Sequence, residues 1–445
     1  MSEILIKNAQ IVNEGKIFKS DILIKEDKIY EISNEILSKD HYILINAENK
    51  LLIPGVIDDQ VHFREPGLTH KATINSESKA AIAGGITSFI EMPNTIPQTT
   101  TINELENKFE LARNNSYANY SFMFGGTNDN LEEIKKLDKK KIPALKLFLG
   151  SSTGNMLVDD EKVLKEIFQN TDLLIAVHSE DEKIINKNLN DFKLKFGNQI
   201  PFDSHPKIRS EEACLKSTKK IIELAKETGA RLHVFHLSTK SESLLFDNKT
   251  PLNKKKITAE VCVHHLWFSD EDYEEKQSLI KWNPAIKTKD DREALWKALN
   301  NDSIDIIATD HAPHTIEEKS KKYLECPSGG PLVQHGLVSM LQHYLNKKIS
   351  IEKIVTKMCH NPADLFQVEK RGYVRKGYFA DLVLIDLNSP WKVEKKNILY
   401  KCKWSPFENI VFDSKVTQTF VNGKLVYNNG EFNNELHGRK LTFER

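Results

Sequence analysis

The sequence predicts an α/β protein, built as a (β/α)8 barrel of the TIM type with a small β-sandwich domain formed by both chain termini. Three observations support this prediction. The chain has 445 residues, enough for more than one domain. Its middle alternates eight times between β-like and helix-like segments, and its two ends contain short β-like runs separated by turn formers. A doubly wound open sheet stays an alternative, because strand counting alone does not exclude it.

The two ends of the chain predict one β domain. The first fifty residues contain four short β-like runs, and the segment from about Arg371 contains three more, with Asn422-Gly423 as a hairpin signal. Neither end is long enough to form a sandwich alone, so we expect them to combine with the middle inserted between them. The predicted boundaries are 1–53 and 367–445 for the β-sandwich domain and 54–366 for the barrel.

The middle of the chain contains eight apolar runs with β-like composition. They are 56–62, 86–92, 120–124, 144–148, 173–178, 232–236, 257–263 and 304–310. Helix-like segments lie between most of them, most clearly at 210–228, where Glu211 and Glu212 occupy the first turn and Gly229 is a stop signal. This alternation is what a parallel eight-stranded barrel requires.

The composition argues against several classes of function. The 63 Lys and Arg residues balance 63 Asp and Glu residues, so no electrostatic argument favours nucleic acid or an anionic membrane as a partner. No apolar run approaches the roughly 20 residues needed to cross a bilayer, and we see no secretion signal. The five scattered cysteines are typical of reduced thiols. We therefore expect a cytoplasmic protein with a small-molecule substrate.

Ionisable residues follow or end several of the predicted strands. They are His62, Lys146, His178, His236 and Asp310, and Asn94 follows the second strand. In a parallel barrel these strand ends converge on the face that carries the active site. One His at a strand end is usually structural, Lys146 alone fits an ion-paired barrel lysine, and Asp310 alone fits a helix cap. Five strand ends with the same pattern indicate a shared site.

These residue types favour a metal centre. Neutral imidazoles and carboxylates are good ligands for Zn²⁺, and a bound zinc ion makes hydroxide available near neutral pH. An adjacent carboxylate, here Asp310, can take the proton of water and deliver it to a leaving nitrogen. Lys146 cannot ligate zinc as an ammonium, but reaction with CO₂ would give a carbamate whose oxygens can bridge two metals. We expect one or two Zn²⁺ per chain.

Nine motifs are spread over almost the whole chain. They are "PGVIDDQVHFREPG" (54–67), "MPNT" (92–95), "LKLFLGSST" (145–153), "VHSED" (177–181), "HVFHLST" (233–239), "VHHLWF" (263–268), "NPAI" (283–286), "ATDHAPH" (308–314) and "GYFADLVLID" (377–386). Their order resembles that of the amidohydrolase superfamily, and within it of the bacterial dihydroorotases related to the domain fused into the animal pyrimidine-synthesis polypeptide. That family's fold is a (β/α)8 barrel with a small β domain made from both termini.

The resemblance implies roles for individual residues. The metal ligands would be His62, Lys146, His178, His236 and Asp310, with Lys146 carboxylated and Asp310 also the catalytic proton shuttle. The substrate contacts would be Arg64, Asn94, Asn283, His314, Ser328 and Gly329. Arg64, Asn94 and His314 match the group that grips a carboxylate, for which a guanidinium offers a rigid fork of donors. Ser152 or Thr153 would reach the substrate from a mobile lid.

Gln60 is the main departure from the family pattern. The family carries His-x-His at the end of the first barrel strand, whereas this chain carries Gln60-Val61-His62. A glutamine coordinates Zn²⁺ through its carbonyl oxygen more weakly than an imidazole does. We therefore expect a metal held by His178 and His236 to be bound tightly and one beside Gln60 to be bound more weakly.

Three functions follow as hypotheses. The leading one is a dihydroorotase, a homodimeric hydrolase of cyclic amides that interconverts N-carbamoyl-L-aspartate and (S)-dihydroorotate in de novo pyrimidine (UMP) biosynthesis. The second is a hydantoinase or dihydropyrimidinase, which Arg64 and His314 disfavour because those substrates lack the carboxylate. The third is a non-catalytic structural partner of aspartate transcarbamoylase, which Gln60 favours and the remaining ligand positions disfavour.

Overall fold

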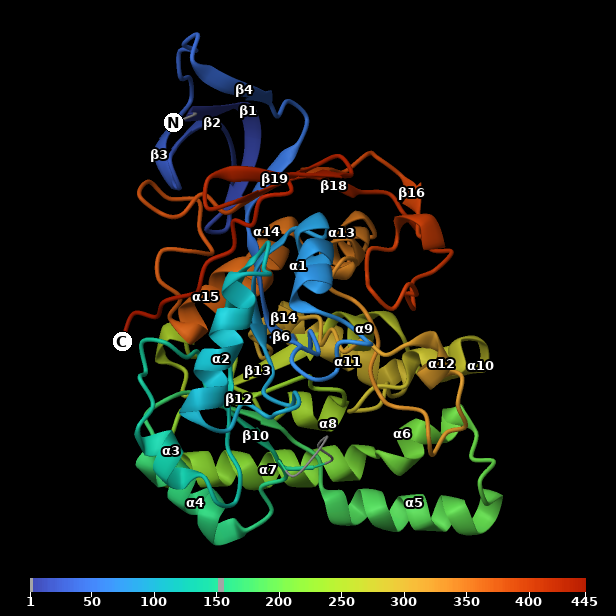
Figure 1. Ribbon diagram of the computed structural model, residues 1–445. Coiled ribbons are helices and arrows are strands. Elements are labelled where there is room, and N and C mark those ends of the chain that lie inside the picture. Colours follow the sequence, from blue (N-terminus) through green and yellow to red (C-terminus); the bar gives the residue numbers. More distant parts are fainter. Residues whose placement is uncertain (1–2, 151–155) are drawn as a thin grey trace.

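A computed structural model describes residues 3–150 and 156–445 of the chain (Figure 1). The barrel occupies the lower part of the view, and a sheet built from both termini lies above it. Ser152 and Thr153, the predicted lid contacts, lie outside the described residues. The fold class is therefore as predicted.

The barrel strands form at all eight predicted runs. They are β6 (Val56–Val61), β7 (Ile86–Glu91), β8 (Asn119–Phe122) continued by β9 (Phe124–Gly125), β10 (Leu145–Phe148), β11 (Ile175–His178), β12 (Leu232–Val234), β13 (Ile257–Cys262) and β14 (Ile306–Ala308). Neighbouring strands pair in parallel and in chain order. Val61 bridges His311 just after β14, and the His62 N–H donates to the His311 carbonyl at 2.7 Å. This contact closes the barrel and excludes the open doubly wound sheet.

Helices surround the barrel strands (Figure 1). The longer ones are α1 (Ile74–Ala83), α2 (Ile102–Arg113), α4 (Glu161–Asn170), α5 (Glu182–Phe196), α7 (Glu211–Thr228), α11 (Lys289–Asn300) and α13 (Gly336–Leu345). The predicted helix forms as α7: the Ser210 side chain accepts a hydrogen bond from the Ala213 N–H, and Gly229 ends the helix in the left-handed conformation with φ of +72°. Its buried Ile221 and Ile222 join the main apolar core.

The terminal sheet joins the two ends of the chain. Its strands are β1 (Glu3–Asn13), β2 (Lys16–Lys25), β3 (Lys28–Ser33), β4 (Tyr42–Asn46), β5 (Leu51–Pro54), β15 (Leu382–Asp386), β18 (Lys415–Val421), β19 (Lys424–Asn428) and β20 (Glu431–Phe432). The join is the antiparallel pair β5–β15, where Leu52 faces Leu384. The predicted hairpin forms between β18 and β19, with positive φ at Asn422 and Gly423.

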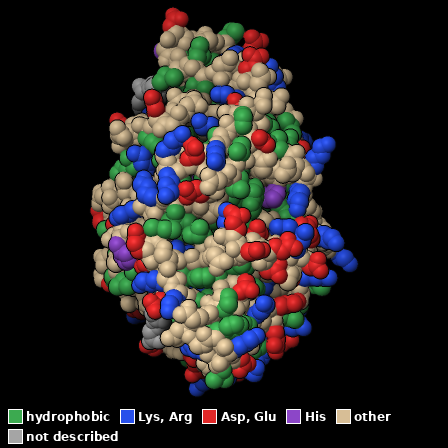
Figure 2. Space-filling model, turned by 90° about the vertical axis from the view of Figure 1, so that its right-hand side faces the viewer, with side chains coloured by type: hydrophobic (Ala, Val, Ile, Leu, Met, Phe, Trp, Pro, Cys, Tyr) green, Lys and Arg blue, Asp and Glu red, His purple; other side chains and the backbone are tan. Residues whose placement is uncertain are grey.

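The surface mixes charges of both signs. Figure 2 shows basic and acidic side chains interspersed over the visible face, as the equal numbers of each in the sequence predict. Among the described residues, every helix is too short or too polar to cross a lipid bilayer.

Candidate active site

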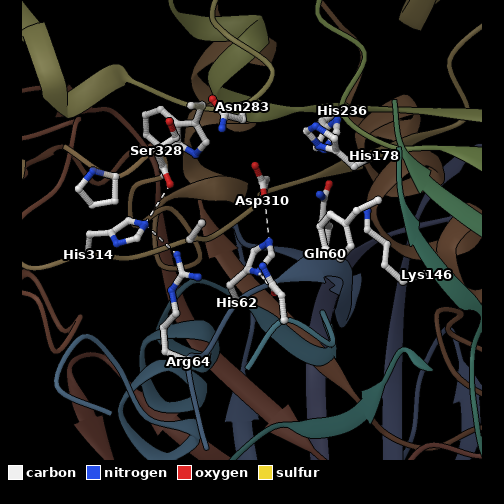
Figure 3. Close-up of a pocket in the computed structure, with 16 residues that line it drawn as sticks. Gln60, His62, Arg64, Lys146, His178, His236, Asn283, Asp310, His314 and Ser328 are labelled. Carbon is white, nitrogen blue, oxygen red and sulfur yellow. Dashed lines mark hydrogen bonds and ion pairs between the residues drawn. The ribbon is translucent and has the colours of Figure 1, made fainter. Parts of the chain in front are cut away.

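A cavity of about 260 Å³ opens at the carboxyl ends of the barrel strands. The candidate residues that the structure describes all line it, namely Gln60, His62, Arg64, Asn94, Lys146, His178, His236, Asn283, Asp310, His314, Ser328 and Gly329. In Figure 3 the candidate metal ligands lie in the middle and on the right, and Arg64, His314 and Ser328 lie on the left. The cavity therefore has a metal-ligand side and a cationic side.

His178 and His236 face each other across a short gap. Nδ1 of His178 lies 3.0 Å from Nε2 of His236. Nε2 of His178 lies 2.9 Å from the carboxylate of Glu180, which Arg209 clamps. Burial alone would raise the pKa of Glu180, but Arg209 and His178 hold that pKa below its usual range. The Glu180 anion thus lies beside Nε2 of His178, while Nδ1 of His178 faces His236, an arrangement that resembles the carboxylate–histidine pairs of metal sites.

His62 is oriented by an amide instead of a carboxylate. Its Nδ1–H donates to Oδ1 of Asn94 at 2.8 Å, so the Nε2 lone pair faces Asp310, 3.3 Å from Oδ1. Gln60 lies beside His62 in the cavity (Figure 3). The Cys262 thiol lies 3.6 Å from the Gln60 carbonyl oxygen and 3.4 Å from the carboxylate of Glu260, so its one proton has two acceptors. The carbonyl oxygen through which Gln60 would bind a metal thus has a thiol beside it.

Lys146 extends from β10 into the cavity. Its side chain is 1% exposed, and its Nζ lies 4.0 Å from the centre of the Phe235 ring. Burial lowers the pKa of Lys146 to about 7, against the opposing effect of the carboxylates of Glu260 and Asp310. A substantial fraction of the amine is therefore neutral at neutral pH. The neutral amine is the form that reacts with CO₂, so Lys146 fits the predicted carbamate.

The protonation states of the other candidate ligands also suit a metal. Burial lowers the pKa values of His62, His178 and His236, so these imidazoles are neutral at neutral pH. Burial raises the pKa of Asp310 to about 7, although Lys146 and His178 act against this rise. Neutral imidazoles and an ionisable carboxylate form a donor set that fits Zn²⁺.

Arg64 supplies the cationic side of the cavity. Its Nε donates to the Pro313 carbonyl at 3.0 Å, and its Nη2 lies 3.1 Å from Nε2 of His314. Burial lowers the pKa of Arg64 to about 10, which leaves the guanidinium charged. In the part of the chain that the structure describes, no carboxylate lies within ion-pair distance of Arg64. A buried cation without a counter-ion is a site for an anionic ligand.

Comparisons with known proteins agree with this geometry. Residues 51–426 match the Amidohydrolase family. A dihydroorotase of Carboxydothermus hydrogenoformans is 35% identical over 432 residues, covering 95% of this chain and 97% of that protein. A dihydroorotase of Pyrococcus horikoshii is 31% identical over 443 residues, covering 99% and 96%.

The chain belongs to the amidohydrolase family. This membership confirms the resemblance identified from the sequence motifs. Among solved structures, an L-hydantoinase of Arthrobacter aurescens superposes with a TM-score of 0.94 at 28% identity, covering 99% of this chain and 100% of that one. The amidohydrolase fold of this chain is thus shared with enzymes named for different cyclic amides. The fold alone therefore does not identify the substrate, and the side chains that line the cavity have to.

The structure adds residues to this amidohydrolase site that the sequence did not single out. Phe148, Trp282, Ala312 and Pro327 also line the cavity. Glu180 is another addition. Its position two residues after His178 was the available signal, because carboxylates commonly orient metal-binding imidazoles.

Two further histidines, His264 and His265, follow β13 and are buried. The His264 ring stacks on Trp282 with 4.5 Å between ring centres. This stacking packs His264 against the indole that lines the cavity.

Proposed function

We propose that this amidohydrolase is a dihydroorotase, which interconverts N-carbamoyl-L-aspartate and (S)-dihydroorotate with loss or gain of water. The observation that carries the proposal is the uncompensated Arg64 guanidinium in the same cavity as His178, His236 and Asp310. Dihydroorotate presents a carboxylate beside a cyclic amide, and therefore needs a cation and a hydrolytic centre within one small cavity.

The residues of the chain divide the reaction between binding and proton transfer. Arg64, the Asn94 amide and His314 bind the substrate carboxylate and so orient the ring amide towards Asp310. In the hydrolytic direction Asp310 takes a proton from the attacking water, whose oxygen bonds to the ring carbonyl carbon. The bond from that carbon to the ring nitrogen then breaks, and Asp310 returns the proton to the nitrogen. Burial raises the pKa of Asp310, which favours its holding the proton between the two transfers.

We assign the candidate metal ligands to two zinc ions, as in the prediction from the sequence. His178 and His236 would hold one zinc ion, His62 and Asp310 a second, and a carboxylated Lys146 would contact both. Bound zinc supplies Lewis acidity, which lowers the pKa of water and polarises the amide carbonyl.

A substrate comparison tests this proposal against a hydantoinase or dihydropyrimidinase function. Purified, zinc-loaded protein is assayed with dihydroorotate and with dihydrouracil, which has the same ring amide without the carboxylate. We expect dihydroorotate to be hydrolysed well and dihydrouracil poorly, because only dihydroorotate gains the contacts of Arg64 and His314. Equal rates on the two substrates would contradict the proposal.

Gln60 favours a second candidate, a non-catalytic structural partner of aspartate transcarbamoylase. In that case the chain would lack turnover on dihydroorotate at saturating zinc and would form a stable complex with the transcarbamoylase in size-exclusion chromatography. Turnover by the chain alone would instead support the enzyme. The retained set of Lys146, His178, His236 and Asp310 in one cavity favours the enzyme, because a scaffold has no physical need of it.

A further inference from the structure

Two buried lysines lie behind the loop 326–329, which forms one wall of the cavity. Lys319 ends α12 (Ile316–Lys319), and Lys281 precedes Trp282. Their exposures are 1% and 7%. No carboxylate of the described residues lies within ion-pair distance of either ammonium. Because burying an unpaired charge is costly, two such lysines next to one loop need an explanation.

Both lysines donate hydrogen bonds to the backbone of this loop. Nζ of Lys319 donates to the carbonyl oxygens of Pro327 at 3.0 Å and Gly329 at 2.9 Å. Nζ of Lys281 donates to the carbonyl of Cys326 at 2.5 Å. Gly329 returns its N–H to the Lys281 carbonyl at 2.8 Å. The lysines therefore fix the peptide planes of the loop.

These contacts determine what the loop presents to the cavity. In a trans peptide the C=O and the following N–H point in opposite directions, and the peptide between Pro327 and Ser328 is trans. Since the Pro327 carbonyl is turned to Lys319, the Ser328 N–H points away from Lys319. Pro327 and Ser328 both line the cavity, and within the described residues this N–H has no hydrogen-bond partner.

The same loop contacts the carboxylate-binding group. The Ser328 carbonyl lies 2.9 Å from Nε2 of His314, whose Nδ1 lies 3.0 Å from the ammonium of Lys71. Lys71 donates to Nδ1 of His314, and Nε2 of His314 faces both the Ser328 carbonyl and Nη2 of Arg64. Lys319 follows His314 by five residues in the chain. One short segment therefore carries both the histidine that would contact the substrate carboxylate and the lysine behind the loop.

We propose that Lys319, supported by Lys281, is a positioning residue that turns the Ser328 amide towards the substrate. The identity of that substrate rests on the proposed function. Burial lowers the pKa of Lys319 to about 7 and that of Lys281 to about 8, because a buried position disfavours the charged form of an amine.

The test replaces Lys319 in the zinc-loaded, full-length protein. We expect Lys319→Met to raise KM for dihydroorotate, and to weaken binding of the unreactive carboxylated analogue orotate, by about tenfold or more, the effect of losing a charge-assisted hydrogen bond. The zinc content should stay unchanged, because Lys319 contacts none of the candidate ligands. Lys319→Gln, which keeps a donor but loses the charge, should recover part of the orotate affinity.

Lys357→Met is the matched control. Lys357 is 1% exposed, and its Nζ donates to the Ile304 carbonyl at 2.7 Å, before the start of β14 and away from the cavity. Unlike Lys319, it also pairs with a carboxylate, that of Asp302, at 2.8 Å. We expect it to lower thermal stability without changing KM. If Lys319→Met changes orotate affinity no more than this control, the positioning role is wrong.

Three further outcomes of this experiment also decide between a positioning role and a structural role of Lys319. Should Lys319→Met fail to fold, Lys281→Met is measured in the same way, and failure of both would show a structural role and contradict the proposal. Wild-type protein that neither hydrolyses dihydroorotate nor binds orotate contradicts the proposed function as well. Wild-type activity with an unchanged KM in a folded Lys319→Met variant contradicts the positioning role alone.

Discussion

His178 and His236 form a pair of imidazoles, whereas the opposite side of the cavity offers the imidazole of His62, the amide of Gln60 and the carboxylate of Asp310. Nε2 of His178 lies 2.9 Å from the Glu180 anion, which Arg209 holds in place. His62 is oriented only by the neutral amide of Asn94. A charged partner raises the basicity of a ligating imidazole more than a neutral one does. The two sides therefore differ in the ligands themselves and in the groups behind them.

This difference explains how Gln60 is compatible with a hydrolytic site. The carbonyl oxygen of Gln60 is a weaker ligand for Zn²⁺ than an imidazole, and the Cys262 thiol lies 3.6 Å from it. One metal ion is enough to lower the pKa of water in single-zinc hydrolases. A site with one strong and one weak position can thus retain activity, and the predictions below separate the two sides.

Asp310→Asn should have the largest effect. It removes the proton shuttle and the anionic ligand of the weaker side together, so turnover should fall by at least ~10²–10⁴. Steady-state kinetics on dihydroorotate measure the loss. A variant with near-normal turnover would show that another group transfers the proton.

Arg64→Ala should come next. The substrate carboxylate would lose its guanidinium, which costs about 2–5 kcal/mol in kcat/KM for a desolvated pair. Metal analysis serves as the control, because zinc content should match that of the wild type on both sides of the cavity. An unchanged kcat/KM for dihydroorotate would show that Arg64 does not bind the substrate carboxylate.

Glu180→Gln should weaken zinc binding at the His178/His236 position alone. The glutamine keeps the shape but loses the charge that orients His178, and we expect zinc affinity at the His178/His236 position to fall by roughly 10–100-fold. Equilibrium titration with a competing chelator measures this change. Glu161→Gln, at a surface carboxylate with 77% side-chain exposure, should bind zinc as the wild type does. An equal effect of both substitutions would contradict the orienting role.

Gln60→His should have the smallest effect on turnover. It adds the imidazole that the His62/Asp310 metal position lacks. The new imidazole should raise zinc affinity at the His62/Asp310 position and leave the His178/His236 position unchanged. Anomalous diffraction at the zinc edge would report the occupancy of each position. Unaltered occupancy beside His62 would show that position 60 does not limit metal binding.

The strand-end residues were predictable because their positions depend on the topology of the barrel. Once the eight apolar runs were placed in a parallel barrel, the ionisable residues at or near the carboxyl ends of five of them had to converge, and these five line the cavity. Their supporting contacts were less predictable. Cys262 lies 202 positions from Gln60, and the lysines behind the loop 326–329 recognise backbone carbonyls, which carry no residue pattern.

Titration of zinc into metal-free native protein tests the asymmetry of the two sides most directly. We predict one tightly bound zinc ion per chain, assigned to His178 and His236, and a second that binds more weakly beside Gln60. Isothermal calorimetry on the full-length chain, with metal content checked by mass spectrometry, resolves the two steps. Two equally tight sites, or no bound zinc at all, would contradict this account.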